Sequence, residues 1–466
     1  MEGRTLTKRR SKPIHMHRTQ SRVESMPNAL ERIRNAARKD KGTRFTALLH
    51  HVSIDRLRNA YRKINRTARP GIDDVTWSEY GENLEDNLRE LHSRVHRGRY
   101  RAKATRRAYI PKPDGRERPL GIASLEDKIV QAAVAEVLNA IYEVDFWGFS
   151  YGFRPGRYPH QALDALAYGI HKRKVNWVLD ADIRGYFDAI SHEHLMELIE
   201  HRIGDKRVLR LIRKWLNAGV LEDGTLRHVK EGTPQGATMS PLLANIYLHY
   251  VFDGWANHWR KQNARGDVVI VRYADDIVVG FQYREEAERF LRDMRARFRH
   301  YSLELHPEKT RLVEFGRFAR KDRHQRGQGK PETFDFLGFT HISAVSKNGK
   351  YLLRRHTIRK RMRNKIKAVR EELKKRMHHP MAQIGTWLRS VLNGYYNYHA
   401  VPTNLRAMKA FRREIAAAWL HALRRRSQRD HTTWENLKPQ LQRWLPSPQC
   451  RHPWPEDRMK LRLNSR

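Results

Sequence analysis

Two adjacent carboxylates stand between two short apolar runs, a spacing that could bind a cation. Asp275 and Asp276 follow residues 269–271 and precede residues 277–279, all of which are Val or Ile. Such β-branched runs predict two strands with the carboxylates at the bend between them. In a continuous strand the two side chains would point to opposite faces, so a shared role requires a hairpin turn. Carboxylates about 4 Å apart repel by roughly 4 kcal/mol at an effective dielectric of about 20, so we expect a positive group beside them. The alternative is a solvated turn, in which Asp is common.

A second acidic pair lies on the strand predicted at residues 177–183. Every second side chain there is apolar, which predicts one buried face and places Asp180 and Asp182 on the other face. A carboxylate that emerges at the end of this strand could complete a cation site with Asp275 and Asp276. The spacing alone does not separate Asp180 from Asp182.

A basic hairpin is predicted at residues 101–122, with two extended segments joined at the Pro-Asp-Gly turn of residues 113–115. Lys112 lies just before the turn, and Arg116 and Arg118 lie just after it. The hairpin could fold over a triphosphate, because Arg makes forked contacts and Lys supplies a point charge. On charge alone, an ordinary solvated hairpin is the alternative.

Three other positions could contribute to the same site. In the loop that starts the segment 232–248, Gly236 permits close approach to a ligand and Gln235 offers an amide donor and acceptor. Lys309 lies at the start of another predicted strand. Phe187 follows a predicted turn, and an aromatic residue near a strand end is usually part of a core.

Composition indicates the partner class. The chain has 466 residues, enough for two or three domains, with 93 Lys and Arg against 51 Asp and Glu and a formal charge of +42. This excess predicts a nucleic-acid partner, and binding to a membrane surface is the weaker alternative. No apolar run reaches the roughly 20 residues that a membrane-spanning helix requires. The single Cys450 fits a reducing compartment, so we expect an intracellular, cytoplasmic protein.

Helical periodicity accounts for much of the remaining chain. We expect a flexible basic arm at residues 1–42, a mixed region at 43–340, a helical domain at 341–445 and a basic tail at 446–466. Within the helical domain, residues 354–377 predict a helix with an apolar line and many cations, which suits a duplex phosphate backbone. The helices predicted elsewhere lie at residues 44–61 (one or two), 77–97, 124–143, 191–202, 207–218, 284–301, 384–399 and 405–426.

The order of these segments is more restrictive than any one of them. Asp275, Asp276 and an aspartate of the 177–183 strand could bind two Mg²⁺ ions, which prefer oxygen ligands. One ion would activate an attacking hydroxyl and the other would stabilise a leaving phosphate oxygen. Phosphoryl transfer on a nucleic-acid track is the chemistry that this combination predicts.

With these residues in place, the sequence resembles reverse transcriptases of the group II intron type over about residues 45–445. The segments that carry the resemblance are residues 110–122, 150–157, Asp182 with Phe187, 234–236, 273–276 and 392–398. It implies an α+β right-hand polymerase with fingers, an antiparallel-sheet palm and an all-α thumb. It also implies an RNA-directed DNA polymerase that adds dNTPs to a DNA primer on an RNA template with two Mg²⁺ ions. Binding of structured intron RNA as a splicing maturase is implied as well, in a bacterial ribonucleoprotein.

By position, the resemblance assigns the metal ligands to Asp182, Asp275 and Asp276, and its spacing to Phe187 selects Asp182 over Asp180. Phe187 would be the steric gate that excludes a 2′-hydroxyl.

The same resemblance gives the other contacts. Lys112 and Arg118 would contact the incoming triphosphate, and Gln235 would contact the sugar region. Lys309 would donate a proton to the pyrophosphate, with an exposed, charge-paired lysine as the alternative. The cations expected to contact nucleic acid are Arg116, Arg359, Lys360, Arg361, Arg363 and Lys365.

Larger family members carry a C-terminal DNA-binding and nuclease module with Cys and His metal ligands. Since this chain ends at Arg466 with one Cys, we expect that module to be absent. Two other functions stay open at this point. One is a splicing cofactor that only binds RNA, and the other is a domesticated or CRISPR-linked reverse transcriptase without an intron.

Overall fold

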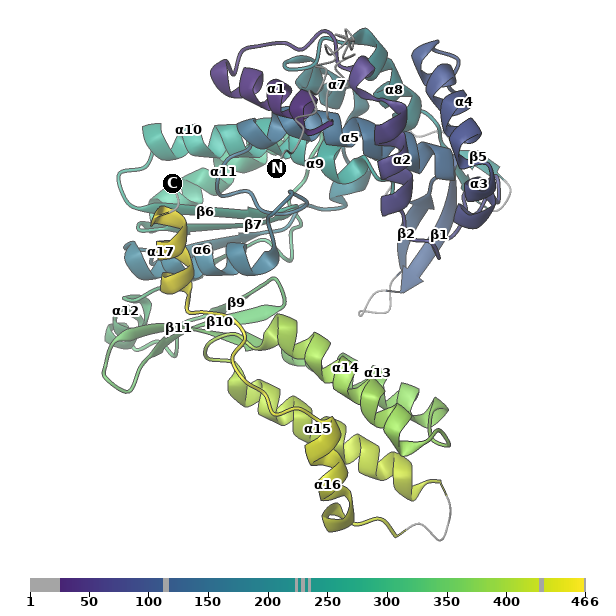
Figure 1. Ribbon diagram of the computed structural model, residues 1–466. Coiled ribbons are helices and arrows are strands. Elements are labelled where there is room, and N and C mark those ends of the chain that lie inside the picture. Colours follow the sequence, from purple (N-terminus) through teal and green to yellow (C-terminus); the bar gives the residue numbers. More distant parts are fainter. Residues whose placement is uncertain are drawn as a thin grey trace, which may run out of the picture.

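Three regions make up the fold (Figure 1). The computed structural model describes residues 26–111, 117–222, 225–227, 231–233, 236–426 and 431–464. A region rich in helices contains most of the first half of the chain, a four-stranded sheet lies at the centre, and a bundle of long helices extends away from them. No helix among the described residues is long and apolar enough to cross a membrane.

The central sheet contains the acidic segments. Its strands are antiparallel and run in the order β6 (Val268–Tyr273), β7 (Asp276–Phe281), β3 (Trp177–Ala181) and β8 (Arg311–Glu314). The β6–β7 pair is the hairpin that the two apolar runs predict. The two strands that end at acidic residues, β7 and β3, therefore lie side by side in the middle of the sheet.

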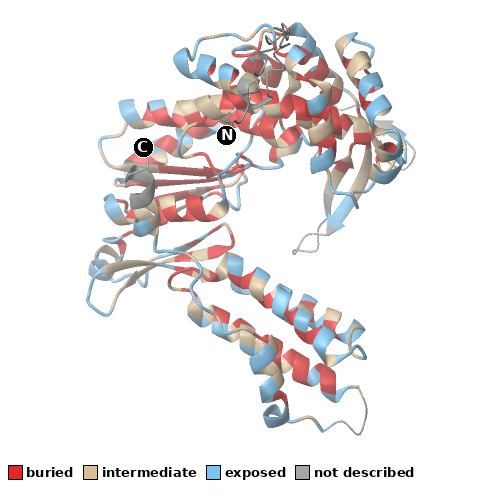
Figure 2. Cartoon of the chain, viewed as in Figure 1, coloured by how far each residue is buried: buried red, intermediate tan, exposed pale blue. Residues whose placement is uncertain are grey.

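Both faces of this sheet are covered. Helix α11 (Arg284–His300) contacts β3 and β7, and α6 (Pro159–Lys172) packs on the other side, where Val178 and Val278 are fully buried (Figures 1 and 2). The expectation of a single buried face on β3 was therefore incomplete. An alternating pattern cannot reveal a helix that covers the second face, because Val178 and Asp180 share that face.

The first half of the chain packs around the long helix α5 (Leu125–Asp145). Helix α1 (Met26–Lys39) lies against α5 and buries Ile33 and Ala37. The expected flexible arm was therefore wrong for residues 26–39, while residues 1–25 lie outside the described part.

The single helix expected at 77–97 is broken at Asn83. The other helices here are α2 (Ile54–Lys63), α3 (Trp77–Glu82), α4 (Leu84–His96), α7 (His192–Glu200), α8 (Lys206–Leu216), α9 (Ser240–Leu248), the π-helical turn η3 (His249–Asp253) and α10 (Gly254–Gln262).

A second sheet lies beside these helices in the order β2-β1-β4-β5. Strands β1 (Thr105–Pro111) and β2 (Glu117–Ile122) form the predicted antiparallel hairpin, whose turn at residues 112–116 lies outside the described residues. Strands β4 (Val220–Glu222) and β5 (Thr225–Arg227) complete the sheet.

A third sheet corrects the expected start of the basic helix. Strands β9 (Thr333–Phe336), β10 (Phe339–Val345) and β11 (Tyr351–Thr357) pair in the order β11-β10-β9. Residues 334–339 form a tight β-hairpin, in which Phe336 pairs with Phe339. The basic helix expected from residue 354 starts at Arg359, because pairing with β10 keeps residues 351–357 extended. The segment between β8 and β9 contains α12 (Ala319–Gln325).

The C-terminal bundle has its own apolar core, in which Trp419 is fully buried. Its helices are α13 (Arg359–Lys375), α14 (Met381–His399), α15 (Leu405–Arg424) and α16 (Trp434–Trp444). The following segment leads back to the central region, where α17 (Pro455–Asn464) packs on α6 (Figure 1). The buried Asp164 of α6 pairs with Arg458 of α17 at 2.6 Å and with Arg355 of β11 at 2.7 Å. The expected basic tail therefore includes a docked helix.

Candidate active site

The turn between β6 and β7 has two residues, because Tyr273 pairs with Asp276 across the hairpin. Ala274 has a φ of +56°, which non-glycine residues rarely adopt outside tight turns. Because of this conformation, Asp275 does not follow the alternation of side chains between the two faces of the strands. Gly152 lies directly against the turn, since a Cβ on it would come within 2.2 Å of the Ala274 nitrogen. The predicted hairpin with its carboxylates at the bend is confirmed.

Strand register brings the second acidic segment to the same place. The last β3–β7 pair joins Ala181 to Ile277, so Asp182 follows directly opposite Asp276. Asp180 pairs with Val278 one step further into the sheet. Residues at paired and alternate positions share a face. Asp180, Asp182 and Asp276 therefore line one face at the end of the sheet that carries the turn.

The electrostatics of Asp276 reflect this crowding. Loss of hydration, then the negative charges of Asp275 and Asp182, raise the pKa of Asp276 to about 7. Arg361 and Lys309 oppose this shift, because cations favour the ionised carboxylate. Part of the Asp276 surface remains exposed, so its hydration is only partly lost. The three aspartates assigned to the metals thus interact with one another.

Asp180 belongs to the same acidic cluster. Loss of hydration raises its pKa to about 7, opposed by Arg311 and reinforced by Asp276, Asp335 and Asp182. Arg311 lies 3.9 Å from the Asp180 carboxylate. Asp180 is half-buried within β3, whereas Asp182 lies just beyond the strand end. The two residues that sequence spacing could not separate therefore differ in their position along the strand, while both are half-buried.

Asp182 has partners for both its backbone and its side chain. Its carbonyl oxygen accepts a hydrogen bond from the backbone N–H of His306 at 2.8 Å. Its Oδ2 lies 2.7 Å from the Nζ of Lys309, which is half exposed. The segment that carries Lys309 is thus fixed beside the acidic cluster, and Lys309 supplies a positive group of the kind expected there.

The donor set suits a hard cation, although the side chains are not arranged around one. Among the described residues, no group of three or more His, Cys, Asp or Glu side chains has a metal-binding arrangement. Carboxylate oxygens are nevertheless the ligands that Mg²⁺ prefers. The pKa of Asp276 is raised first by loss of hydration and then by the charges of Asp275 and Asp182, and a cation would relieve the second effect. Metal binding here would require side chains to rotate and Lys309 to release Asp182.

Phe187 lies in a short 3₁₀ turn (Tyr186–Asp188) immediately after Gly185. Its ring is half-buried and meets the ring of Phe153 edge-on, with centroids 6.3 Å apart. Phe153 has a φ of +55° and is 52% exposed. Phe153 was not among the predicted site residues, because the sequence does not show that an aromatic side chain is exposed.

Several predicted nucleotide contacts lie outside the described residues: Lys112, Arg116, Gln235 and the side chain of Arg118. The structure describes residues next to these contacts in the sequence. Gly236 has a φ of +105°, and a Cβ on it would be 3.1 Å from the carbonyl oxygen of Gly121 in β2. The loop that carries Gln235 therefore approaches the strand that follows the basic hairpin turn.

The cations predicted on α13 are all exposed. Arg361 is near enough to the turn to lower the pKa of Asp276. Ile366, Val369 and Leu373 face the bundle core instead. The set comprises Arg359, Lys360, Arg361, Arg363 and Lys365.

Sequence analysis also missed Arg272 and Asp253, which form a buried ion pair behind the turn. A charged residue inside the apolar run of β6 was the available signal for Arg272. Asp253 is more than fifteen residues away and gave no signal of its own.

The sequence similarity of this chain to known proteins agrees with the geometry of the site. The family described as "Reverse transcriptase (RNA-dependent DNA polymerase)" matches residues 110–341. Protein YkfC of Escherichia coli (strain K12) is 35% identical over 240 residues, which cover 45% of this chain and 62% of that protein. The group II intron-encoded protein LtrA of Lactococcus lactis subsp. cremoris is 38% identical over 228 residues, covering 47% and 37%. An uncharacterized 91 kDa protein in the cob intron of Schizosaccharomyces pombe is 46% identical over 144 residues, covering 31% and 18%. The chain thus spans less than two thirds of each of these relatives.

Proposed function

Because the chain belongs to the reverse transcriptase family, we propose that it is an RNA-directed DNA polymerase that extends a primer on an RNA template. The observation that supports this most is the register that puts Asp182 opposite Asp276, with Asp275 in the adjoining turn. All three lie within the matched residues 110–341.

The regions of the fold take the roles of a right-hand polymerase in this proposal. The central sheet with α6 and α11 is the palm. The sheet that begins with the β1–β2 hairpin, together with the N-terminal helices, forms the fingers. The bundle α13–α16 is the thumb, whose exposed cations on α13 face a template–primer duplex through its phosphates. Arg116 and the five α13 cations contact nucleic acid.

The reaction is one phosphoryl transfer per nucleotide. The 3′-oxygen of the primer attacks the α-phosphorus of a dNTP and forms the new phosphodiester bond. The bond from that phosphorus to the bridging oxygen breaks, and pyrophosphate leaves. The 3′-hydroxyl proton passes to water. When bound, two Mg²⁺ ions would activate the attacking oxygen and stabilise the leaving one, and Asp182, Asp275 and Asp276 would hold them.

Other residues of the chain bind and select the nucleotide. Lys112 and Arg118 contact the triphosphate, and Gln235 contacts the sugar region. Phe187 lies under the sugar and excludes a 2′-hydroxyl. Lys309 gives a proton to the leaving pyrophosphate once it is released from Asp182, to which it is bonded at 2.7 Å.

We also propose that the chain binds structured intron RNA as a maturase. Two observations favour this second function. LtrA, which is 38% identical over 228 residues, is a group II intron-encoded protein, and the formal charge of +42 favours binding to a polyanion such as RNA. The maturase function predicts that splicing support survives loss of the acidic cluster.

Primer extension tests the polymerase proposal. The chain should extend a DNA primer on an RNA template with dNTPs and Mg²⁺. Asp182→Asn, which keeps the side-chain shape, should abolish extension and retain duplex binding. Extension at the normal rate by Asp182→Asn would contradict the proposal.

A further inference from the structure

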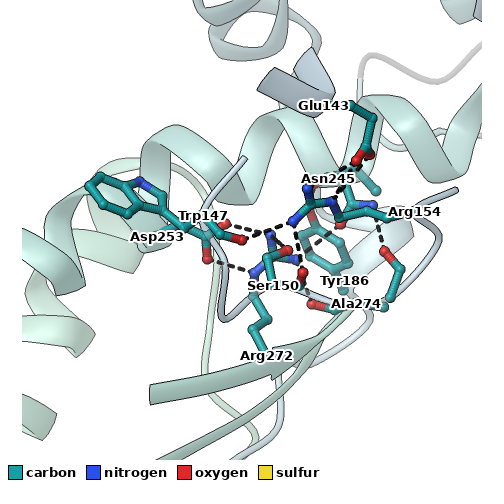
Figure 3. A network of polar contacts seen from close by, with 11 residues as sticks. Glu143, Trp147, Ser150, Arg154, Tyr186, Asn245, Asp253, Arg272 and Ala274 are labelled. Carbon is teal, nitrogen blue, oxygen red and sulfur yellow. Dashed lines mark hydrogen bonds and ion pairs between the residues drawn. The ribbon is translucent and has the colours of Figure 1, made fainter. Parts of the chain in front are cut away.

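Arg272 is a fully buried arginine two residues before the turn that carries the acidic pair. Its Nε donates to Oδ1 of Asp253 at 2.7 Å, and its Nη2 lies 2.6 Å from Oδ2 of the same carboxylate (Figure 3). Neither side chain of this ion pair is exposed to solvent. The two parallel contacts define the plane of the guanidinium group.

The remaining donors of Arg272 reach the turn and two other elements. Nη1 donates to the carbonyl oxygen of Ala274 and to Oδ1 of Asn245, both at 3.0 Å. Nη2 also donates to Oγ of Ser150 at 2.7 Å. An arginine has five N–H groups, and the acceptors of Arg272 match all five.

These acceptors come from segments that surround the turn (Figure 3). Asn245 lies on α9 and also donates to the carbonyl oxygen of Gly152 at 2.7 Å. Ser150 lies beside β6. Asp253 is the last residue of the π-helical turn η3, a helix irregularity that is frequent at functional sites. One guanidinium group therefore joins the turn to two other segments, the continuous helical stretch of α9 and η3 and the segment that contains Ser150.

The contact with Ala274 has a specific consequence. The Ala274 carbonyl belongs to the peptide bond that leads into Asp275. A donor fixed on this oxygen restricts rotation of that peptide plane, and with it the direction of the Asp275 side chain. The unusual φ of Ala274, +56°, needs such support because non-glycine residues rarely adopt it.

We propose that Arg272, oriented by Asp253, is a positioning residue that sets the direction of the Asp275 and Asp276 carboxylates. The inference rests on the proposed polymerase function for its catalytic consequence, but not for its structural one. A buried ion pair is seldom more stabilising than a well-packed apolar pair. Its retention here is explained by geometry, since only the planar fork of Arg makes all these contacts at once.

Arg272→Lys tests the proposal, because it keeps the charge and removes the fork. We expect kcat for single-nucleotide addition to fall by about 10²-fold, since small misplacements at a reaction centre have effects of this size. The KM for dNTP should stay within about threefold, because the nucleotide-binding groups are untouched. A kcat within about threefold of the wild type would overturn the proposal.

Hydrogen exchange followed by mass spectrometry gives a readout that does not depend on activity. In Arg272→Lys, amides of residues 273–276 should exchange about tenfold faster, while those of β3 keep their rates. Unchanged exchange in the turn would overturn the proposal. If the wild-type protein were inactive in primer extension but the turn exchanged faster in Arg272→Lys, the polymerase function would be rejected and the positioning role supported.

Arg202→Lys is the matched control. Arg202 forms another buried ion pair, 2.8 Å from Asp145, in the helical region away from the turn. The Arg202→Lys substitution should lower thermal stability and leave both kcat and the hydrogen exchange of the turn unchanged. If it lowered kcat as much as Arg272→Lys, the effect would be general destabilisation, and the proposal would fail.

Ser150→Ala provides a second variant should Arg272→Lys not fold. It removes one hydrogen bond to Arg272 and leaves the ion pair with Asp253 intact. We expect faster exchange in the turn and a kcat loss of about threefold to tenfold, consistent with one hydrogen bond. If both the exchange of the turn and kcat stayed at their wild-type values, the proposal would be overturned.

Discussion

The Nζ of Lys309 lies 2.7 Å from Oδ2 of Asp182, so an ammonium group stands beside the acidic cluster at the end of the sheet. This ion pair competes with any divalent cation for the same carboxylate. It also places Lys309 beside one of the three aspartates that would hold the metals.

Removing the ammonium group should make metal binding easier. We expect Lys309→Ala to reach half-maximal primer extension at a Mg²⁺ concentration about threefold to tenfold lower than the wild type, because a competing charge is gone. Lys309→Arg is the control and should keep the wild-type requirement. An unchanged requirement in Lys309→Ala would show that the ion pair does not limit metal binding.

The same variant separates the two roles considered for Lys309. If Lys309 protonates the pyrophosphate, kcat at saturating Mg²⁺ should fall by about 10²-fold. We expect this loss, with the KM for dNTP unchanged. A wild-type kcat at saturating Mg²⁺ would leave Lys309 as a charge partner only.

The raised pKa of Asp276 predicts a pH-dependent stability difference in the absence of metal. The pKa is about 7 in the folded chain, whereas a freely solvated aspartate has a pKa near 3.8. The folded state therefore holds the proton more tightly, and the stability this provides is lost as pH rises through 7. Asp276→Asn removes this loss. Its melting temperature should exceed that of the wild type at pH 8, on the order of 2 °C, and the gain should vanish towards pH 4. A difference that is the same at both pH values would contradict the assignment.

Phe187 should control sugar selection. Replacing it with Ala should raise the efficiency of rNTP relative to dNTP incorporation by about 10²-fold, because a steric block is removed. Phe153→Ala is a suitable control, since Phe153 touches Phe187 edge-on and is itself exposed. It should change discrimination much less. Unchanged discrimination in Phe187→Ala would remove the steric-gate assignment.

The exposed cations of α13 should contribute to the salt dependence of duplex binding. Replacing Arg359, Lys360 and Arg363 by Gln should reduce the slope of log affinity against log salt by about 2 to 3, because each phosphate contact releases counterions. The control replaces Arg289, Arg292 and Arg295, which are exposed on α11, and should leave the slope unchanged. Equal losses in both variants would mean that binding follows net charge and not the α13 surface.

Local patterns predicted the centre of the site. The two runs of Val and Ile at 269–271 and 277–279 predicted both the hairpin and the place of its carboxylates, since short β-branched runs favour strands. The alternation in residues 177–183 predicted the strand, but not that Asp182 would lie opposite Asp276. That depends on register between segments nearly one hundred residues apart.

What sequence missed depends on long-range packing. The sequence predicts a flexible arm where α1 forms, because the two buried residues of this helix, Ile33 and Ala37, are few among many polar ones. Residues 354–357 were expected to begin the basic helix, but pairing with β10 keeps them extended. The partner of Arg272, Asp253, becomes evident only where the chain folds back on itself.

The most direct test of the account is single-nucleotide addition to a DNA primer on an RNA template by the Asp275→Ala, Asp276→Ala double variant in Mg²⁺. We predict loss of at least about 10³-fold in rate, with duplex affinity and thermal unfolding close to those of the wild type. Nucleotide addition at the wild-type rate by this variant would contradict the assignment of the acidic turn as the catalytic centre.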